Sequence, residues 1–342
     1  MRCRRRSGGG GPARPGSVTP ATYSGRVTPA DETLLDLALS RALIDRSARE
    51  RADEETVARA LDDHRTRVLV VRGGRSPLLG TGEDVRLALR PPSAADRSRV
   101  PWFLGRHDGV AYLAVDEPGG VDDDRPAGGG HDGGWASLRE VGADLDDLEV
   151  GLLTTATALQ GWHARHGHCP RCGAATHVVQ GGWVRRCPED GSEHYPRTDP
   201  AVIMAVVDDD DRLLLATGTG WAPGRISVLA GFVEAGETME AAVVREVYEE
   251  VGVRVTDLVF RGDQPWPFPA SLMLGFRARA TSTRLDPDPE EISEADWYTR
   301  EQLAARLADG SRTLPARVSI ARRLIEEWYG GELIEPASGR RP

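Results

Sequence analysis

The stretch from Gly231 to Val253 constrains the fold of this chain most, because its acidic residues recur at helical spacing. Glu249 and Glu250 follow Glu246 by three and four residues, so an α-helix places all three on one face. Valines at every fourth position form the predicted buried stripe of that helix, at Val243, Val247 and Val251. Such carboxylates repel one another unless a cation lies among them, and oxygen ligands suit Mg2+ or Mn2+. The alternative is a solvated helix face with ordinary Arg–Glu pairs.

The order of residues around this helix is equally regular. Gly231 is followed after five residues by Glu237, and Glu237 after seven more by REVYEEVGV, at 245–253. This order matches the Nudix box at every defined position, so the chain resembles the Nudix hydrolases. The resemblance implies a divalent-metal enzyme that hydrolyses a nucleoside diphosphate linked to another group. In that family, the residues matching Glu246 and Glu250 bind metal, and those matching Glu237 and Arg245 brace the loop against the helix.

The bulk composition is that of a globular protein with more than one domain. The 342 residues are 28% charged and 39% hydrophobic, with a net charge of −10. That charge argues against broad electrostatic capture of duplex nucleic acid, which needs many basic contacts. No apolar run is long enough to predict a membrane span. The four cysteines do not suggest a disulfide framework, and we expect a cytoplasmic protein.

We predict an α+β chain with a mixed N-terminal domain and a small zinc ribbon, and the resemblance to the Nudix hydrolases implies a C-terminal Nudix α/β/α sandwich with a mixed sheet. The first residues contain six arginines and no acid, which is typical of a disordered tail; a basic arm for RNA is the alternative. The predicted parts are a disordered basic tail (1–30), the N-terminal domain (31–144), an amphipathic connecting helix (145–167), the zinc ribbon (168–196) and the Nudix domain (197–335).

Three clustered cysteines predict the zinc ribbon. Cys169 and Cys172 are two residues apart and can hold one tetrahedral ion, and a second pair is expected at Cys187. The partner position there holds Asp190 instead of a thiol. Asp190 and His194 each offer an atom type that binds zinc, so the fourth ligand stays open. A ribbon that has lost its metal is the alternative, and zinc held at a closed site would be structural.

Elements of the C-terminal half can be predicted from apolar runs. Strands are expected at 201–207 and 212–216, joined by a turn of four aspartates, and a last helix at 314–328. The sequence DQPWPFPAS, at 263–271, alternates prolines with aromatic residues and cannot pair as a central strand. We predict a rigid, extended wall that holds Trp266 and Phe268 against an aromatic base.

QPWPFPAS after the Nudix box, the ribbon before it, and Tyr195-Pro together resemble the NADH pyrophosphatase branch of the Nudix hydrolases. The resemblance implies cleavage of NADH or NAD to nicotinamide mononucleotide and AMP, removal of NAD caps from RNA by some members, and homodimers. It implies metal ligation by Ala230 (through its carbonyl), Glu246, Glu250 and Glu291. It implies a substrate site lined by Tyr195, Phe232, Gln264, Pro265, Trp266, Pro267, Phe268, Pro269, Ala270, Ser271 and Ala321. Asp190 replaces the fourth zinc cysteine, and Asp263 stands where serine is usual.

The predicted reaction is metal-assisted hydrolysis in which Glu249 or Glu250 orients or deprotonates water and Glu246 helps to hold metal. Two other functions stay open on the residues alone. One is hydrolysis of a different nucleoside diphosphate, such as ADP-ribose or a dinucleoside polyphosphate. The other is a non-catalytic module that senses nucleotide and binds RNA, although such a module has no need to keep every box carboxylate.

Overall fold

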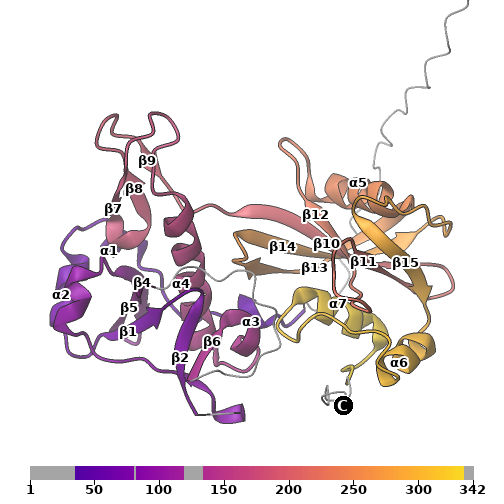
Figure 1. Cartoon of the computed structure of the whole chain (residues 1–342), viewed down its shortest axis with the longest axis horizontal. Helices are drawn as coiled ribbons and strands as arrows, with labels where there is room; N and C mark the ends of the chain where they lie inside the picture. Colours follow the sequence, from indigo (N-terminus) through magenta and orange to yellow (C-terminus); the bar gives the residue numbers. More distant parts are fainter. Residues whose placement is uncertain (1–34, 81, 119–133, 335–342) are drawn as a thin grey trace, which may run out of the picture.

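The computed structural model describes residues 35–80, 82–118 and 134–334 (Figure 1). The predicted basic tail lies outside the described residues, as does most of the Gly- and Asp-rich segment after Glu117. The N-terminal domain and the ribbon lie at one end of the described chain and the Nudix domain at the other, with the long strand β10 reaching between them. The predicted α+β class is confirmed.

The C-terminal domain is built on one mixed sheet. Its strands follow the order β13–β14–β10–β11–β15, and β12 pairs with β10. β10 runs parallel to β14 and antiparallel to β11 and β12, which makes the sheet mixed as predicted. The strands are β10 (Asp199–Val207), β11 (Leu213–Gly218), β12 (Leu229–Phe232), β13 (Val255–Trp266), β14 (Ser271–Ala280) and β15 (Ile292–Tyr298).

Helices cover both faces of this sheet because β10 is apolar on both sides. Val202 and Met204 pack in a core with the valine stripe of α5 (Met239–Val251). Ile203 and Ala205, which point the other way, pack with α6 (Arg300–Ala308) and α7 (Ile320–Tyr329). The result is the predicted α/β/α sandwich, with α5 on one face of the sheet and α6 and α7 on the other.

The N-terminal domain contains two three-stranded sheets, β1–β5–β4 and β3–β2–β6. Its strands are β1 (Arg67–Val71), β2 (Arg75–Leu79), β3 (Arg86–Leu87), β4 (Trp102–His107), β5 (Val110–Asp116) and β6 (Trp135–Ser137). Its short helices are α1 (Ala48–Arg51), α2 (Thr56–Asp62) and α3 (Leu138–Val141). The start of the described chain joins the other domain, since the N–H of Leu35 bonds the Arg261 carbonyl and Leu37 packs in the α6–α7 core.

The helix α4 (Asp147–Arg165) corrects one expectation. The sequence predicts an amphipathic connector, but α4 is buried along most of its length and contributes Leu152, Leu153 and Leu159 to the N-terminal core. The small residues between the leucines let neighbouring elements approach α4 on several sides. α4 is therefore the core helix of the N-terminal domain as well as its link to the ribbon.

Two further expectations are wrong in detail. The last helix begins at Ile320, not at 314, because Ser319 caps it by accepting a hydrogen bond from the Ala321 N–H at 3.2 Å. The proline–aromatic segment is not extended throughout: β13 continues to Trp266 as an edge strand, and 267–270 form the turn into β14. An edge position tolerates Pro265, which has no N–H to donate.

The described residues contain no helix that is both long and apolar enough to span a membrane.

Candidate active site

The helix that carries the acidic face has well-defined ends. Thr238, a residue type favoured at this position, caps its start: Thr238 Oγ1 accepts a hydrogen bond from the Ala241 N–H at 3.2 Å. Gly252 ends the helix in a left-handed conformation, with φ of 72°. Val243, Val247 and Val251 are buried beneath it, so the carboxylates face away from the core.

Arg245 fixes the loop that precedes α5. Its guanidinium donates to both carboxylate oxygens of Glu237, at 2.8 and 2.7 Å, and to the Phe232 carbonyl at 2.9 Å. It also donates to Glu246 Oε1 at 2.9 Å and to Glu249 Oε2 at 3.0 Å. The hydrogen bonds, led by those to Glu237, raise the pKa of Arg245. One cation therefore holds the loop and two acids of the helix in a single network.

Gly231 lies against the carboxylate of Glu246. A Cβ atom built on Gly231 would come within 1.9 Å of the Glu246 carboxyl carbon and within 2.2 Å of both of its oxygens. No real Cβ contact is this short, so only glycine leaves Glu246 in its place. This contact explains sterically why the first position of the motif is a glycine.

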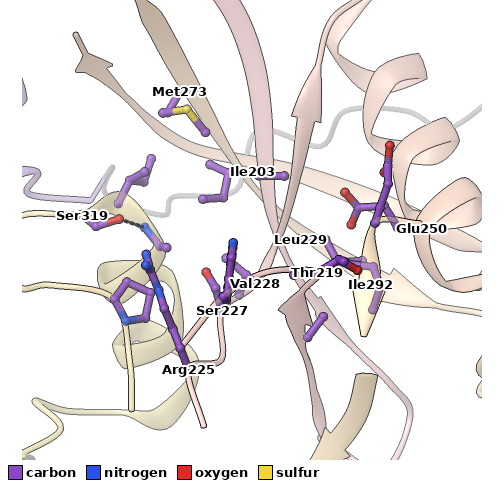
Figure 2. Close-up of a pocket in the computed structure, with 18 of the residues that line it drawn as sticks. Ile203, Thr219, Arg225, Ser227, Val228, Leu229, Glu250, Met273, Ile292 and Ser319 are labelled. Atoms are coloured by element: carbon purple, nitrogen blue, oxygen red, sulfur yellow. Dashed lines mark hydrogen bonds between the residues drawn. The ribbon is translucent and has the colours of Figure 1, made fainter. Parts of the chain in front are cut away.

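A cavity of about 460 Å³ opens beside the helix. Figure 2 shows Glu250 toward one part of it and Arg225 and Ser319 toward another, and Glu291 and Ala230 also line it. Its walls also include Ile203, Trp221, Ser227, Trp266, Met273 and Ala321. Elements from the middle and the end of the chain thus form one chamber with an acidic region and a region that holds a guanidinium group.

Electrostatics make the acidic region suited to a cation. Burial, followed by the charges of Glu246 and Glu291, raises the pKa of Glu250 to about 8. Burial also raises the pKa of Glu246, against the effect of Arg245. Glu250 Oε2 is buried with no hydrogen-bond partner among the described residues. A buried carboxylate oxygen without a donor and facing like charges fits a hard divalent ion.

The three carboxylates do not form a closed cage in this structure. Within the described ranges, a group of three or more metal-binding side chains with all ligand atoms inside 4.8 Å occurs only in the ribbon. Glu246 is held by Arg245, and like charges without a cation stay apart. Glu249 has an exposed side chain and does not line the cavity, whereas Glu250 does.

The ribbon brings its predicted ligands together. It consists of β7 (His177–Val179), β8 (Val184–Arg186) and β9 (Glu193–His194). One ligand atom each from Cys169, Cys172, Cys187 and Asp190 lies within 4.8 Å of the others. His194 is outside this group, and its Nε2 lies 3.1 Å from Ser192 Oγ. The Ser192 N–H and hydroxyl both donate to Asp190 Oδ1, which leaves Oδ2 on the side of the Cys169 thiol, at 3.8 Å.

Comparisons with known proteins agree with this arrangement. Residues 197–318 match the NUDIX domain, and residues 164–195 match the NADH pyrophosphatase zinc ribbon domain. A Mycobacterium bovis protein named NAD-capped RNA hydrolase NudC is 40% identical over 319 residues, which cover 86% of this chain and 95% of the relative. This chain is a Nudix hydrolase. It belongs to the branch that carries the NADH pyrophosphatase zinc ribbon.

Two further relatives bear the same kind of name. The NAD-capped RNA hydrolase NudC of Stutzerimonas stutzeri is 40% identical over 235 residues, or 68% of this chain and 79% of the relative. The human NAD-capped RNA hydrolase NUDT12 is 42% identical over 196 residues, or 54% of this chain and 42% of the relative. The similarity therefore extends beyond the Nudix domain itself.

The predicted substrate residues of this Nudix hydrolase occupy three different surroundings. Trp266 and Ala321 line the cavity, but Gln264 does not: it is fully buried and donates through Nε2 to the Val318 carbonyl at 2.7 Å. That hydrogen bond holds the loop before α7 in place. Gln264 therefore supports residues that line the cavity but does not line the cavity itself. Phe232 and Tyr195 are 57% and 62% exposed, and neither lines the cavity.

The remaining residues of the proline–aromatic segment lie on or behind the wall. Phe268 packs edge-to-face on Trp266, with ring centroids 5.1 Å apart, under the guanidinium of Arg139 at 4.1 Å. A second cavity behind the wall is lined in part by Pro265, Pro267, Ala270 and Ser271. Pro269 follows Phe268 in the turn and lines a third, smaller hollow beside Trp162.

Sequence reasoning missed the basic side of the active-site cavity. Arg225 lies over the ring of Trp221, with 4.7 Å between the guanidinium carbon and the ring centroid, and Ser227 and Ser319 line the same cavity. None of the three belongs to a recognisable motif. They meet only because α7 packs beneath the sheet, so no local pattern could have indicated them.

Proposed function

We propose that this Nudix hydrolase cleaves the pyrophosphate of NADH or NAD to nicotinamide mononucleotide and AMP, and acts in the same way on NAD-capped RNA. The observation that carries the proposal is the single cavity lined by Glu250 and Glu291 of the acidic region and by Trp266 and Ala321. Carboxylates suit a metal-bound pyrophosphate, and an apolar, aromatic wall suits a planar ring. The names of the three relatives support NAD-linked substrates.

The residues that would hold Mg2+ or Mn2+ are Glu246, Glu250, Glu291 and the carbonyl of Ala230. The unpartnered Oε2 of Glu250 and the mutual repulsion of these acids support that assignment. A divalent ion bound there supplies positive charge against the pyrophosphate and makes water more acidic. Arg245 holds the Nudix loop, so that the Ala230 carbonyl and Glu246 keep a fixed relation to each other.

The protein residues have distinct tasks in the proposed hydrolysis. Glu250 faces the cavity from a buried position, so it can orient water and accept its proton, whereas Glu249 is tied to Arg245 at the surface. The water oxygen forms a bond to one phosphorus, the bridging P–O bond breaks, and the second nucleotide leaves with the bridging oxygen. Trp266 and Ala321 position the substrate, and Phe232, at the end of β12, is exposed and available for stacking.

A substrate panel tests this proposal against the nearest alternative. The purified enzyme is incubated with Mn2+ and with NADH, NAD, ADP-ribose and a dinucleoside polyphosphate, and the products are separated by chromatography. AMP and reduced nicotinamide mononucleotide from NADH, at the highest kcat/KM of the panel, support the proposal. Higher kcat/KM for ADP-ribose assigns the enzyme to that substrate, and bound but uncleaved NADH indicates a sensor.

We further propose that the enzyme is a cytoplasmic homodimer, as its branch of the family implies, and that its ribbon holds structural zinc. Three thiols and one carboxylate are a donor set that suits a tetrahedral zinc ion. The orientation of Asp190 Oδ2 toward the Cys169 thiol favours Asp190 over His194 as the fourth ligand.

Replacing Asp190 should therefore weaken zinc binding, while replacing His194 should not. We expect Asp190→Ala to raise the dissociation constant for zinc more than about 100-fold, since even outer-shell partners of zinc ligands are worth about 10- to 100-fold. Competition with a chromophoric chelator, using enzyme purified without chelator, measures the constant directly. His194→Ala is the matched control; the larger loss in that variant would make His194 the ligand.

A further inference from the structure

A second cavity, of about 200 Å³, lies where three parts of the chain meet. Thr154 comes from α4, Trp183 comes from the ribbon, and Arg197 is the first residue of the Nudix domain. Trp266 lines this junction cavity as well as the active-site cavity. One aromatic side chain therefore borders both chambers, and a substrate that extends past Trp266 could reach the junction cavity.

Two arginines without acidic partners stand at the junction cavity. Arg46 lines it, with its guanidinium carbon 5.5 Å from the centre of the Trp183 ring, and the guanidinium carbon of Arg51 is 3.9 Å from the same ring. No ion pair joins either arginine to an acid among the described residues. The nearest acids in sequence are engaged elsewhere: Asp45 accepts from the Ser47 N–H at 2.8 Å, and Glu50 pairs with Arg106 at 2.8 Å.

The guanidinium group of Arg51 also lacks hydrogen-bond acceptors among the described residues. Nε and Nη1 of Arg51 are buried with no partner in the described part of the chain. Burial and the charge of Arg46 lower the pKa of Arg51, because the two positively charged side chains repel each other. Buried donors without acceptors cost free energy, and an anion in the cavity beside Arg46 would offset the repulsion between the two positive charges.

The cavity wall holds a further polar group without a partner. Thr154 is only 7% exposed, it lines the cavity, and its Oγ1 has no hydrogen-bond partner among the residues described. A buried hydroxyl can donate to or accept from a ligand that fills the space. Its position on the rigid core helix α4 keeps the hydroxyl in place without a ligand.

The combination of these groups identifies the kind of ligand. Guanidinium groups bind phosphate oxygens, an indole ring offers a stacking surface, and a hydroxyl can bond a sugar or a base edge. An isolated inorganic anion would leave unused the part of Trp183 that lines the cavity, whereas an apolar ligand would leave Arg46 without an acidic partner. A nucleotide uses all three groups.

We propose that the junction cavity binds a nucleotide of the RNA chain that follows an NAD cap. This inference rests on the proposed function, because the cap must occupy the active-site cavity for the RNA to pass Trp266. Arg46, which lines the cavity, would contact the phosphodiester, Trp183 would contact the base, and the charge of Arg51 behind Trp183 would add to the attraction for phosphate. The site would therefore favour capped RNA over the free dinucleotide, which is too short to occupy both cavities.

The test compares kcat/KM for NADH and for a short single-stranded NAD-capped RNA in the same enzyme preparations. Arg46→Ala and Thr154→Val should each lower kcat/KM for the capped RNA, by about tenfold for Arg46→Ala, and leave kcat/KM for NADH within twofold. Arg49→Ala is the matched control, since Arg49 is an exposed arginine three residues along that does not line the cavity. It should change neither value.

Each other outcome overturns the inference. An unchanged kcat/KM for capped RNA in Arg46→Ala shows that the cavity binds no RNA, and an equal loss on both substrates shows an effect on the active site instead. Cleavage of NADH by the wild type without cleavage of capped RNA refutes the inference alone. Failure of the wild type to cleave NADH refutes the proposed function, and with it the inference that rests on that function.

Discussion

Glu250→Gln should lower kcat for NADH by about 10²-fold or more, the size expected for the loss of a catalytic acid–base group. Glu250 is the carboxylate of the Nudix helix that is both buried and directed into the cavity, and one of its oxygens has no protein partner. Glutamine keeps the size and shape of the side chain but removes the negative charge. The loss should therefore appear in turnover and in the affinity for Mg2+.

The same substitution should leave the fold intact. Burial opposes the ionised form of Glu250, as its raised pKa shows, so a neutral amide does not destabilise the metal-free protein. Circular dichroism and thermal unfolding in chelator check this. Glu240→Gln makes the same change of charge near the start of the same helix, where the side chain has no hydrogen bond in this structure to lose, and should keep wild-type turnover. Near-wild-type hydrolysis by Glu250→Gln would remove Glu250 from the mechanism.

Gly231→Ala should cost a comparable amount of activity without touching any charged group. The added methyl would lie within 2.2 Å of the Glu246 carboxylate oxygens, so either the carboxylate or the β12 backbone must move. A displacement of about 1 Å at a reacting centre can lower the rate about 10²-fold. Because Glu246 is a proposed metal ligand, the concentration of Mn2+ needed for half-maximal activity should rise as well.

A steady-state titration with Mn2+ separates this effect from general damage. Gly331→Ala is the control, since a Cβ at Gly331 meets no heavy atom within 4 Å, and it should behave like the wild type. If Gly231→Ala changes neither kcat nor the Mn2+ concentration for half-maximal activity, Glu246 can move without loss of catalysis, and its observed position is not required.

The parts of the structure that local rules decide were predictable from the sequence. Thr238 as N-cap and the buried valine stripe of α5 follow from spacing alone, and the structure has both. Side chains of β10 alternate between the two cores on either face of the sheet, as expected for a strand that is apolar at every position from 201 to 207. The turn of four aspartates between β10 and β11 was also predictable, and in it Arg212 Nε donates to Asp208 Oδ2 at 2.8 Å.

The parts that depend on distant packing were not predictable in this way. The periodicity of α4 suggested one apolar face, but tertiary contacts bury nearly all of the helix. Gln264 lies within a motif that suggests substrate contact, yet it is buried against Val318. Arg225 reaches the active-site cavity, and Arg46 the junction cavity, only because segments far apart in sequence meet there. No motif marks either position.

The most direct test of the central claim is product analysis of NADH hydrolysis by the wild-type enzyme, with Mg2+ and with excess chelator. We expect equal amounts of AMP and reduced nicotinamide mononucleotide with Mg2+, and no products in chelator, because the pyrophosphate needs the cation that Glu246, Glu250 and Glu291 are proposed to hold. Intact NADH in the presence of Mg2+, or equal cleavage in its absence, would contradict it.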